Sequence, residues 1–186
     1  MTSVCFFGSA NDAVPAAMLL AARDFGAACA QRGWRLVYGG SRKGLMAQAA
    51  AGALGGGGEV IGVMPQRLVQ RELANPAITR LHVVDTLAER KQMMADLSDA
   101  FVALPGGVGT LDELIEMVSW FDLGVHQKPT YLCNIDGFWD PLLAQIERFR
   151  ERGMLRANAG GSLHPATDVA SLVTALARFL GGGAKA

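Results

Sequence analysis

Residues 101–121 read FVALPGGVGTLDELIEMVSWF, in which a short apolar run is followed by a glycine-rich loop and then by apolar residues at helical spacing. The first run has the length and composition of a buried strand, and the last part predicts a helix. The helix is expected to turn one apolar arc inward, which consists of Leu111, Leu114, Val118 and Phe121. The segment therefore predicts one strand–loop–helix unit.

Further apolar runs of strand length occur along the chain, and helical stretches separate most of them: residues 4–7, 35–38, 60–64, 81–84 and 130–133. Repeated βα units with near-continuous apolar strands are typical of a parallel sheet covered by helices on both faces. We therefore expect a single-domain α/β Rossmann-like fold over residues 1–180, with a mostly parallel sheet of about six to seven strands. Residues 181–186 are expected to form a flexible C-terminal tail.

Capping and breaking residues give the expected helix boundaries. The first helix is expected to begin near Asn11 or Asp12, to hold Pro15 in its first turn and to end at Gly33. The alanine-rich stretch 47–53 is expected to lie in the next helix, where its small residues let helix and sheet approach closely.

The composition limits the classes of function. The 17 basic and 17 acidic residues give a formal net charge of zero, so no overall positive charge attracts nucleic acid or an anionic membrane. The sequence shows neither an export signal nor a run of about 20 uncharged apolar residues. Its three cysteines are widely spaced in apolar runs, which favours reduced thiols, and its histidines lack metal-ligand spacing. We expect a soluble, cytoplasmic protein without a metal, nucleic-acid or membrane partner.

The glycine-rich loop is the first candidate for ligand binding, because ligands of such folds bind beyond the carboxyl ends of the strands. Its glycines leave backbone N–H groups uncovered, so the loop and the Thr110 hydroxyl could hold a phosphate at the helix N-terminus. It matches neither a Walker loop nor G-x-G-x-x-G. An ordinary helix start is an equally good interpretation, since Thr110 and Glu113 have the spacing of a capping box.

Arg90 breaks the expected pattern of its helix. At about 100° per residue it falls between Leu87, Met94 and Leu97, inside the apolar arc, and Lys91 lies at the edge of that arc. The two side chains could simply extend their charged ends to solvent, or they could form a cation clamp for a phosphate or a buried carboxylate. A local rule broken in this way is more often a site than an accident.

Two other loops carry charges that are ordinary solvated residues when taken alone. Glu72 stands in the irregular stretch after Pro65, and Arg42 and Lys43 interrupt the glycines after Tyr38. A basic group in the second loop could reach a ligand phosphate.

Together these features resemble the LOG family of cytokinin-activating phosphoribohydrolases, long labelled possible lysine decarboxylases. The resemblance covers most of the chain and lies in CFFGSA at 5–10, VYGGSRKGLM at 37–46, VIGVMP at 60–65, ERKQMM at 89–94 and PGGVGTLDELIEMVSW at 105–120. The family hallmark is a PGGxGTxxE motif preceded by an Arg-Lys pair. Both parts are intact here, and the combination is specific.

The resemblance implies a Rossmann-like homodimer that hydrolyses AMP and related nucleotides, including cytokinin nucleotides, to free base and ribose 5-phosphate. It implies no metal or organic cofactor. It makes Glu113 the catalytic carboxylate and Arg90 its catalytic partner, and Lys91 completes the clamp. The substrate-binding residues that it implies are Ser9, Gly40, Glu72, Arg90, Lys91, Gly106, Gly107, Val108, Gly109, Thr110, Leu111 and Asp112.

Departures from the family pattern surround this expected pocket and leave the Arg-Lys pair and Glu113 untouched. They make the reaction type better defined than the substrate. The departing residues are Leu87 and Ala88 in place of Met-His, Ser41 to Lys43 after the second strand, Val108 inside the loop, and Val118 near the position of a substrate-contacting threonine.

Two other functions share parts of this pattern. A non-catalytic nucleotide or molybdenum-cofactor-type carrier or sensor could have the same core and glycine loop. A lysine decarboxylase is disfavoured, because the sequence shows nothing like a pyridoxal phosphate site with its Schiff-base lysine.

A second apolar stripe on the glycine-loop helix bears on assembly. Met117 and Trp120 lie beside Glu113, outside the first arc. We expect them to contribute to a homodimer interface that borders the active site. The alternative is that another helix of the same chain covers them.

Overall fold

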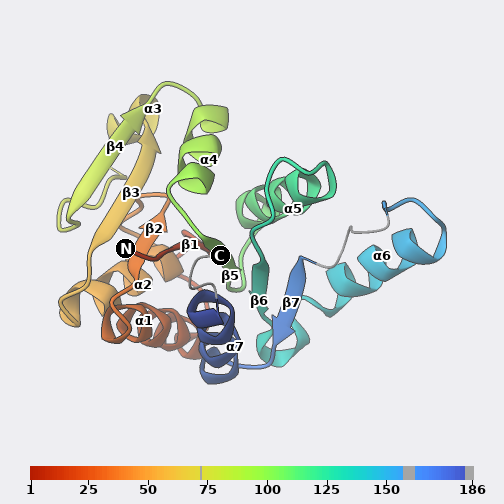
Figure 1. The fold of residues 1–186 in the computed structure, drawn as a ribbon. Helices are drawn as coiled ribbons and strands as arrows, with labels where there is room; N and C mark the ends of the chain where they lie inside the picture. The colour runs from red at the N-terminus through yellow and green to blue at the C-terminus, as the bar shows by residue number, and fades with distance from the viewer. Residues whose placement is uncertain (72, 157–161, 183–186) are drawn as a thin grey trace.

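Seven parallel strands form one sheet in the computed structural model, which describes residues 1–71, 73–156 and 162–182 (Figure 1). The strands lie in the order β4-β3-β2-β1-β5-β6-β7, and each neighbouring pair is parallel. Their bounds are β1 Ser3–Phe7, β2 Arg35–Tyr38, β3 Val60–Pro65, β4 Arg80–Val84, β5 Ala100–Ala103, β6 Thr130–Cys133 and β7 Leu163–Ala166. The six strands expected from apolar runs are all confirmed.

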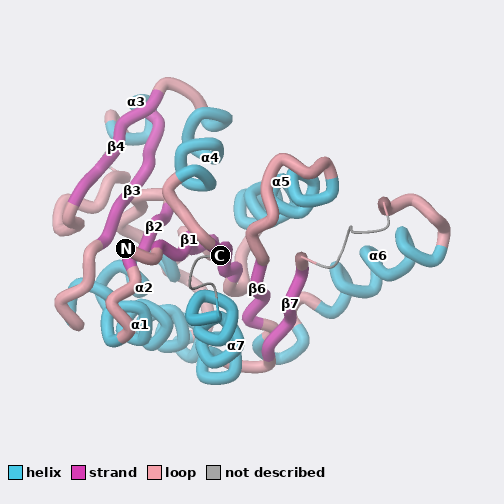
Figure 2. Tube along the Cα trace, viewed as in Figure 1, coloured by secondary structure: helices cyan, strands magenta, loops and turns pink. Residues whose placement is uncertain are grey.

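Helices cover both faces of the sheet, as Figure 2 shows. On one face lie α1 Ala16–Gln31, α2 Gly44–Gly55 and α7 Val169–Gly182, and on the other lie α4 Leu87–Asp96, α5 Val108–Asp122 and α6 Asp140–Glu151. A short helix, α3 Gln66–Val69, and a 3-10 turn, η1 Ile135–Gly137, complete the described elements. The α/β Rossmann-like architecture is thereby confirmed.

Alternate side chains of each central strand build two separate cores. In β1, Val4 and Phe6 belong to the cluster under α1, α2 and α7, whereas Cys5 and Phe7 belong to the cluster under α4 and α5. All four are at most 2% exposed. A strand buried on both faces reads as a continuous apolar run, which is why the strands were readable from the sequence.

The strand order creates a crevice at the carboxyl end of β1. From β1 the chain proceeds outward through β2, β3 and β4, and it then returns to add β5 on the other side of β1. The connections after β1 and β5 therefore diverge from this switch point, which is where such folds bind ligands. The glycine-rich loop follows β5 directly.

The start expected for the first helix is wrong by about one turn. The N-terminal residue of α1 is Ala16 and Pro15 is its N-cap. The polar residues read as a helix start have other partners: Asn11 Oδ1 accepts a hydrogen bond from the N–H of Ala13, and Asp12 Oδ1 accepts one from the N–H of Gly44. Asn11 thus forms a local turn and Asp12 ties the loop to α2, so neither caps α1. Gly33, with φ +67°, lies just beyond the end of the helix, near the expected stop.

The small residues of α2 chiefly bring two helices together, whereas the expectation was a close contact of helix with sheet. A Cβ on Gly26 of α1 would lie 1.9 Å from the carbonyl oxygen of Ala49, and one on Gly52 of α2 would lie 2.0 Å from that of Arg23. The backbones of α1 and α2 are therefore in direct contact through paired glycines.

The C-terminal part departs from expectation in two details. β7 was not foreseen because its short sequence, LHPA, contains a proline and is only partly buried, which an edge strand tolerates. The tail was expected to begin at Gly181, but α7 extends through Gly182. Residues 183–186 lie outside the described residues.

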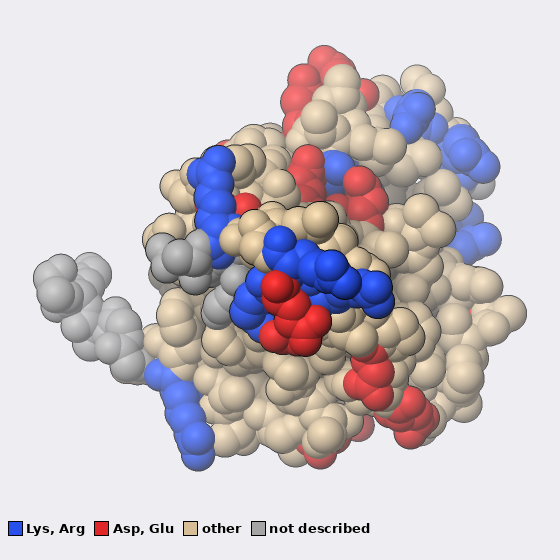
Figure 3. Space-filling view, turned by 90° about the vertical axis from the view of Figure 1, so that its right-hand side faces the viewer, with Lys and Arg blue, Asp and Glu red and all other residues tan. Residues whose placement is uncertain are grey.

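Charges are interleaved on the face that carries α6. Figure 3 shows acidic side chains beside basic ones there, and α6 itself contains Arg148 and Arg150 together with Glu147 and Glu151. Arg150 forms an ion pair with Glu147. Among the described helices, none combines the length and apolar character needed to cross a bilayer.

Candidate active site

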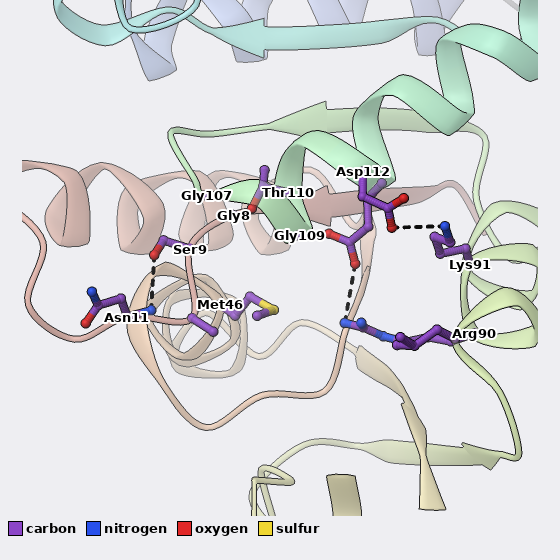
Figure 4. A pocket seen from close by; sticks show the side chains of 13 residues that line it. Gly8, Ser9, Asn11, Met46, Arg90, Lys91, Gly107, Gly109, Thr110 and Asp112 are labelled. Atoms are coloured by element: carbon purple, nitrogen blue, oxygen red, sulfur yellow. Dashed lines mark hydrogen bonds and ion pairs between the residues drawn. The ribbon is translucent and has the colours of Figure 1, made fainter. Parts of the chain in front are cut away.

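A cavity of about 570 Å³ opens at the switch point, and Figure 4 shows the residues around it. Four segments form its walls: the loop after β1, one residue of α2, one face of α4 and the start of α5. The lining residues are Gly8, Ser9, Ala10, Asn11, Met46, Leu87, Arg90, Lys91, Gly107, Gly109, Thr110, Asp112 and Glu113. Four of the five sequence segments that carried the family resemblance thus contribute residues to one cavity, and the segment at 60–65 does not line it.

The α5 end of the cavity is an open helix N-terminus. Gly107 is the N-cap and has no side-chain oxygen to offer, so the first N–H groups of α5 remain available to a ligand. A Cβ on Gly106 would lie 2.2 Å from Thr110 Oγ1, and the buried Thr110 therefore packs directly over this glycine. The geometry suits an anion at the positive end of the helix dipole.

The capping-box interpretation of Thr110 and Glu113 is wrong. Because α5 begins at Val108, Thr110 already lies inside the helix and cannot cap it. A capping box does occur at the start of α4, where Thr86 Oγ1 accepts a hydrogen bond from the N–H of Glu89 and Glu89 Oε2 accepts one from the N–H of Thr86. Glu89 therefore fixes the start of the helix that carries Arg90.

Arg90 reaches across the cavity to Glu113. Its Nη2 lies 3.4 Å from Glu113 Oε1, and its Nε donates a hydrogen bond of 3.1 Å to the carbonyl oxygen of Val63. The two side chains are 13% and 10% exposed. Arg90 is thus a nearly buried cation clamped onto a carboxylate, and it does not extend to solvent.

Glu113 titrates far from its ordinary range. Burial raises its pKa to about 7, and the charge of Arg90 opposes this rise without cancelling it. Among the smaller influences, Asp112 raises the pKa further and Lys91 lowers it. A carboxyl group with this pKa exchanges protons near neutral pH, which is a common property of catalytic acids and bases.

Lys91 is held at the cavity rim by two carboxylates of α5. Its Nζ lies 3.0 Å from Asp112 Oδ2 and 2.9 Å from Glu116 Oε2. Burial lowers the pKa of Lys91, but its bonds with Glu116 and Asp112 outweigh this and leave the pKa raised. Lys91 therefore remains a cation and ties α4 to α5 next to Glu113.

The loop after β1 forms the opposite wall. Ser9 Oγ accepts a hydrogen bond of 3.1 Å from the N–H of Asn11, which shapes the loop around the cavity. Ser9 was expected here and Leu87 was expected around the pocket, whereas Gly8, Ala10, Asn11 and Met46 were not singled out as lining residues. The CFFGSA and GLM segments of the family pattern were the available signal for Gly8 and Met46.

Several other expected residues do not line the cavity. Gly106 borders a smaller pocket beside it, together with Pro105 and Phe138. Val108 is 85% exposed, Leu111 points outward from α5, and Gly40 packs against Leu81 and Met64. Glu72 lies outside the described residues.

The basic loop after β2 and the departure at Val118 also lie away from the cavity wall. Arg42 and Lys43 are exposed and do not line the cavity, in agreement with plain solvation. Val118 is a core residue under α5. Within the residues that the structure describes, no three His, Cys, Asp or Glu side chains are grouped so that they could hold a metal ion.

Comparison with known proteins identifies close relatives. The family model described as possible lysine decarboxylase matches residues 46–176. A probable cytokinin riboside 5'-monophosphate phosphoribohydrolase of Oryza sativa subsp. japonica is 42% identical over 83% of this chain and 70% of its own length. A cytokinin riboside 5'-monophosphate phosphoribohydrolase of Rhodococcoides fascians is 41% identical over 83% of this chain and 79% of its own.

The same fold also occurs in a protein that is named for carrying a cofactor. A molybdenum cofactor carrier protein from Chlamydomonas reinhardtii superposes with a TM-score of 0.74, covering 97% of this chain and 98% of the carrier. The two sequences are 24% identical, so this likeness concerns the fold alone.

Proposed function

The chain belongs to the LOG family, and from this we propose that it hydrolyses the N-glycosidic bond of adenine-type nucleoside 5'-monophosphates, cytokinin nucleotides included, to free base and ribose 5-phosphate. Its relatives at about 40% identity are named for this reaction. The observation that carries the proposal is the buried Arg90–Glu113 pair beside the open N-terminus of α5.

The phosphate is held at the start of α5. The backbone N–H groups near Gly107 and Gly109, together with the Thr110 hydroxyl, offer donors at the positive end of the helix dipole. Glu113 lies one turn further along the same helix, so a nucleotide anchored there presents its ribose to the carboxyl group. Binding energy from the phosphate thereby positions a bond that lies several atoms away.

The carboxylate of Glu113 stabilises the positive charge that develops on the ribose as the bond to the base breaks, and it orients the attacking water. The water oxygen bonds to the anomeric carbon and the water loses one proton, while the pair of electrons of the broken bond leaves with the base and the base gains one proton, so that protons balance over the reaction. Arg90 keeps Glu113 in place and favours its ionised form.

The alternative functions have weaker support. The carrier interpretation depends on fold likeness at 24% identity. A lysine-dependent Schiff base at Lys91 is disfavoured, because its bonds with Glu116 and Asp112 keep the pKa of the amine raised, whereas a Schiff-base lysine must lose its proton.

Replacing Glu113 tests the proposal most directly. The Glu113→Gln variant keeps the shape and a hydrogen-bonding partner for Arg90, so AMP binding measured by calorimetry should change little while base release falls by at least about 10³-fold. The wild type should release base from AMP and isopentenyl-AMP, and adenosine, which lacks the phosphate, is the control. A fully active Glu113→Gln variant would remove the carboxyl group from the mechanism, and equal turnover of adenosine would contradict the phosphate site.

Three finer points belong to the same proposal. Glu72 is a substrate contact by its match to the family pattern. The protein acts as a homodimer whose interface borders the cavity. The free, buried thiols of Cys5, Cys29 and Cys133 support a location in the cytoplasm.

A further inference from the structure

The guanidinium group of Arg90 lies directly on the backbone of Gly39, which follows the last residue of β2. A Cβ built on Gly39 would lie 1.7 Å from Nη2 of Arg90 and 2.9 Å from its Cζ. Real side-chain carbons do not approach other atoms this closely, so a side chain at position 39 requires the guanidinium end of Arg90 to leave the position that it has here. The next nearest atom is Sδ of Met46 at 3.3 Å, which a flexible thioether can accommodate.

The backbone conformation of Gly39 does not require a glycine. Gly39 is absent from the residues with positive φ, whereas its neighbour Gly40 has φ +77°. Gly40 packs on Leu81 and Met64, away from the cavity. The two consecutive glycines therefore serve different needs: Gly40 allows the turn of the chain, and Gly39 leaves space for a side chain from α4.

The position of Arg90 is thus fixed from three sides. Its Nε is held by the carbonyl oxygen of Val63 within β3, its Nη2 faces Glu113, and its guanidinium is supported by Gly39. A methyl group at position 39 would occupy the place of Nη2, which is the nitrogen that reaches Glu113. The contact with the carboxylate would be lost even if the Nε bond remained.

We propose that Gly39 is a positioning residue for the reaction: the absence of its side chain forms the slot through which Arg90 reaches Glu113. This inference rests on the proposed function, because it assigns Gly39 a role through the Arg90–Glu113 pair. Gly39 itself is not among the residues that line the cavity, so its role is one of position and not of chemistry.

The first test is the kinetics of Gly39→Ala with AMP, using full-length protein. A misplaced catalytic group can cost on the order of 10²-fold in rate, so kcat should fall by about that factor while KM changes less than about threefold. Arg90 lowers the pKa of Glu113, and its displacement should therefore move the acidic limb of the kcat/KM profile to higher pH. A purely structural defect would not shift this limb.

A steric control separates these effects from general damage. Gly56→Ala places a Cβ 2.7 Å from Cβ of Ala30, in the turn after α2 and away from the cavity, and should leave kcat and the pH profile unchanged. Wild-type kcat and an unshifted acidic limb in Gly39→Ala would overturn the inference. An inactive wild type would instead contradict the proposed function itself.

If Gly39→Ala folds poorly, a double-mutant cycle of Gly39→Ala with Arg90→Ala, measured by thermal unfolding, provides the test. Since the clash is with the guanidinium group, Gly39→Ala should lower Tm in the wild-type background and have little effect in the Arg90→Ala background. An equal loss of Tm in both backgrounds, or failure of the double variant to fold where Arg90→Ala alone folds, would show that position 39 requires glycine for another reason and would overturn the inference.

Discussion

At the scale of single residues, the site depends on a carboxyl group whose ionisation is balanced by opposing effects. Burial of Glu113 favours the neutral form, and the nearby Arg90 favours the charged form. The resulting pKa of about 7 leaves both forms populated at neutral pH. A fully exposed glutamate would be ionised there, and a fully buried one without Arg90 would be largely neutral.

This balance predicts the pH dependence of the reaction. Because the ionised carboxylate stabilises the ribose cation, kcat/KM for AMP should fall about tenfold per pH unit below the pKa of Glu113, which is about 7. The rate above that pH should level off. The measurement is base release between pH 5 and 9 with the folded state verified by circular dichroism at each pH. A flat profile from pH 5 to 8 would contradict the assignment.

The phosphate of AMP itself titrates near pH 6. A variant is therefore needed to decide whether the acidic limb of the kcat/KM profile reports Glu113 or the substrate. Asp112 raises the pKa of Glu113, and Asp112→Asn should therefore move the limb to lower pH, whereas the ionisation of AMP stays the same. An unmoved limb would assign it to the substrate.

Sequence reasoning identified some residues of the site and missed others for a physical reason. Arg90 and Lys91 were found because a charge in an apolar arc breaks a periodic pattern. Gly39 and Met46 break no local rule, and their roles arise only when β2, α2 and α4 are brought together. Among the glycines after β2, the sequence pointed to Gly40 and not to the one that contacts Arg90.

At the scale of the element, the start of α5 contains glycines with opposite tolerance to a side chain. Gly109 lines the cavity and a Cβ built on it meets no atom within 4 Å, whereas one on Gly106 collides with Thr110. Gly109 is also a helical residue, where alanine is favoured over glycine by roughly 0.5–1 kcal/mol.

We therefore expect Gly109→Ala to raise stability slightly while it raises KM for AMP by about tenfold, because the methyl group covers the phosphate-binding end of the helix. Gly106→Ala should instead lower Tm, since Thr110 must move. Thermal unfolding and steady-state kinetics of the pair provide the comparison. Unchanged KM in Gly109→Ala would place the phosphate elsewhere.

Helix starts were harder to predict from the sequence than strands, because a polar side chain that could cap a helix can instead bond to a distant part of the chain. Strands were readable since burial on both faces leaves continuous apolar runs. The start of α1 was misplaced because Asp12 serves as an acceptor for Gly44, 32 residues away, and a local pattern does not reveal such a partner. The same applies to Thr110 and Glu113, whose spacing fits a cap although the helix begins earlier.

At the scale of the whole molecule, the apolar surface of α5 bears on the proposed homodimer. Met117 was expected in a stripe for a partner, but it is 1% exposed and belongs to the core beneath α5, so the same chain covers it. Leu111, expected to face inward, is 38% exposed, and Ile115 one turn later is 37% exposed. Trp120 lines a groove between α4 and α5 with Val84, Ala88 and Met93.

The outward face of α5 and the neighbouring groove therefore replace Met117 as the expected contact surface. They adjoin the cavity through Lys91, which bonds to Glu116 on the same face of α5. If two copies of the chain meet at this surface, a charged side chain at position 115 should separate them, because the charge would be buried without a partner. We expect the Ile115→Arg variant to be monomeric by light scattering at micromolar concentration, and its base release to fall as the cavity loses its neighbouring subunit. Leu20→Arg, at a 61% exposed position of α1 on the opposite side of the sheet, should remain dimeric and active. A wild type that is monomeric at this concentration would contradict the homodimer, and a dimeric, fully active Ile115→Arg variant would place the interface on another face.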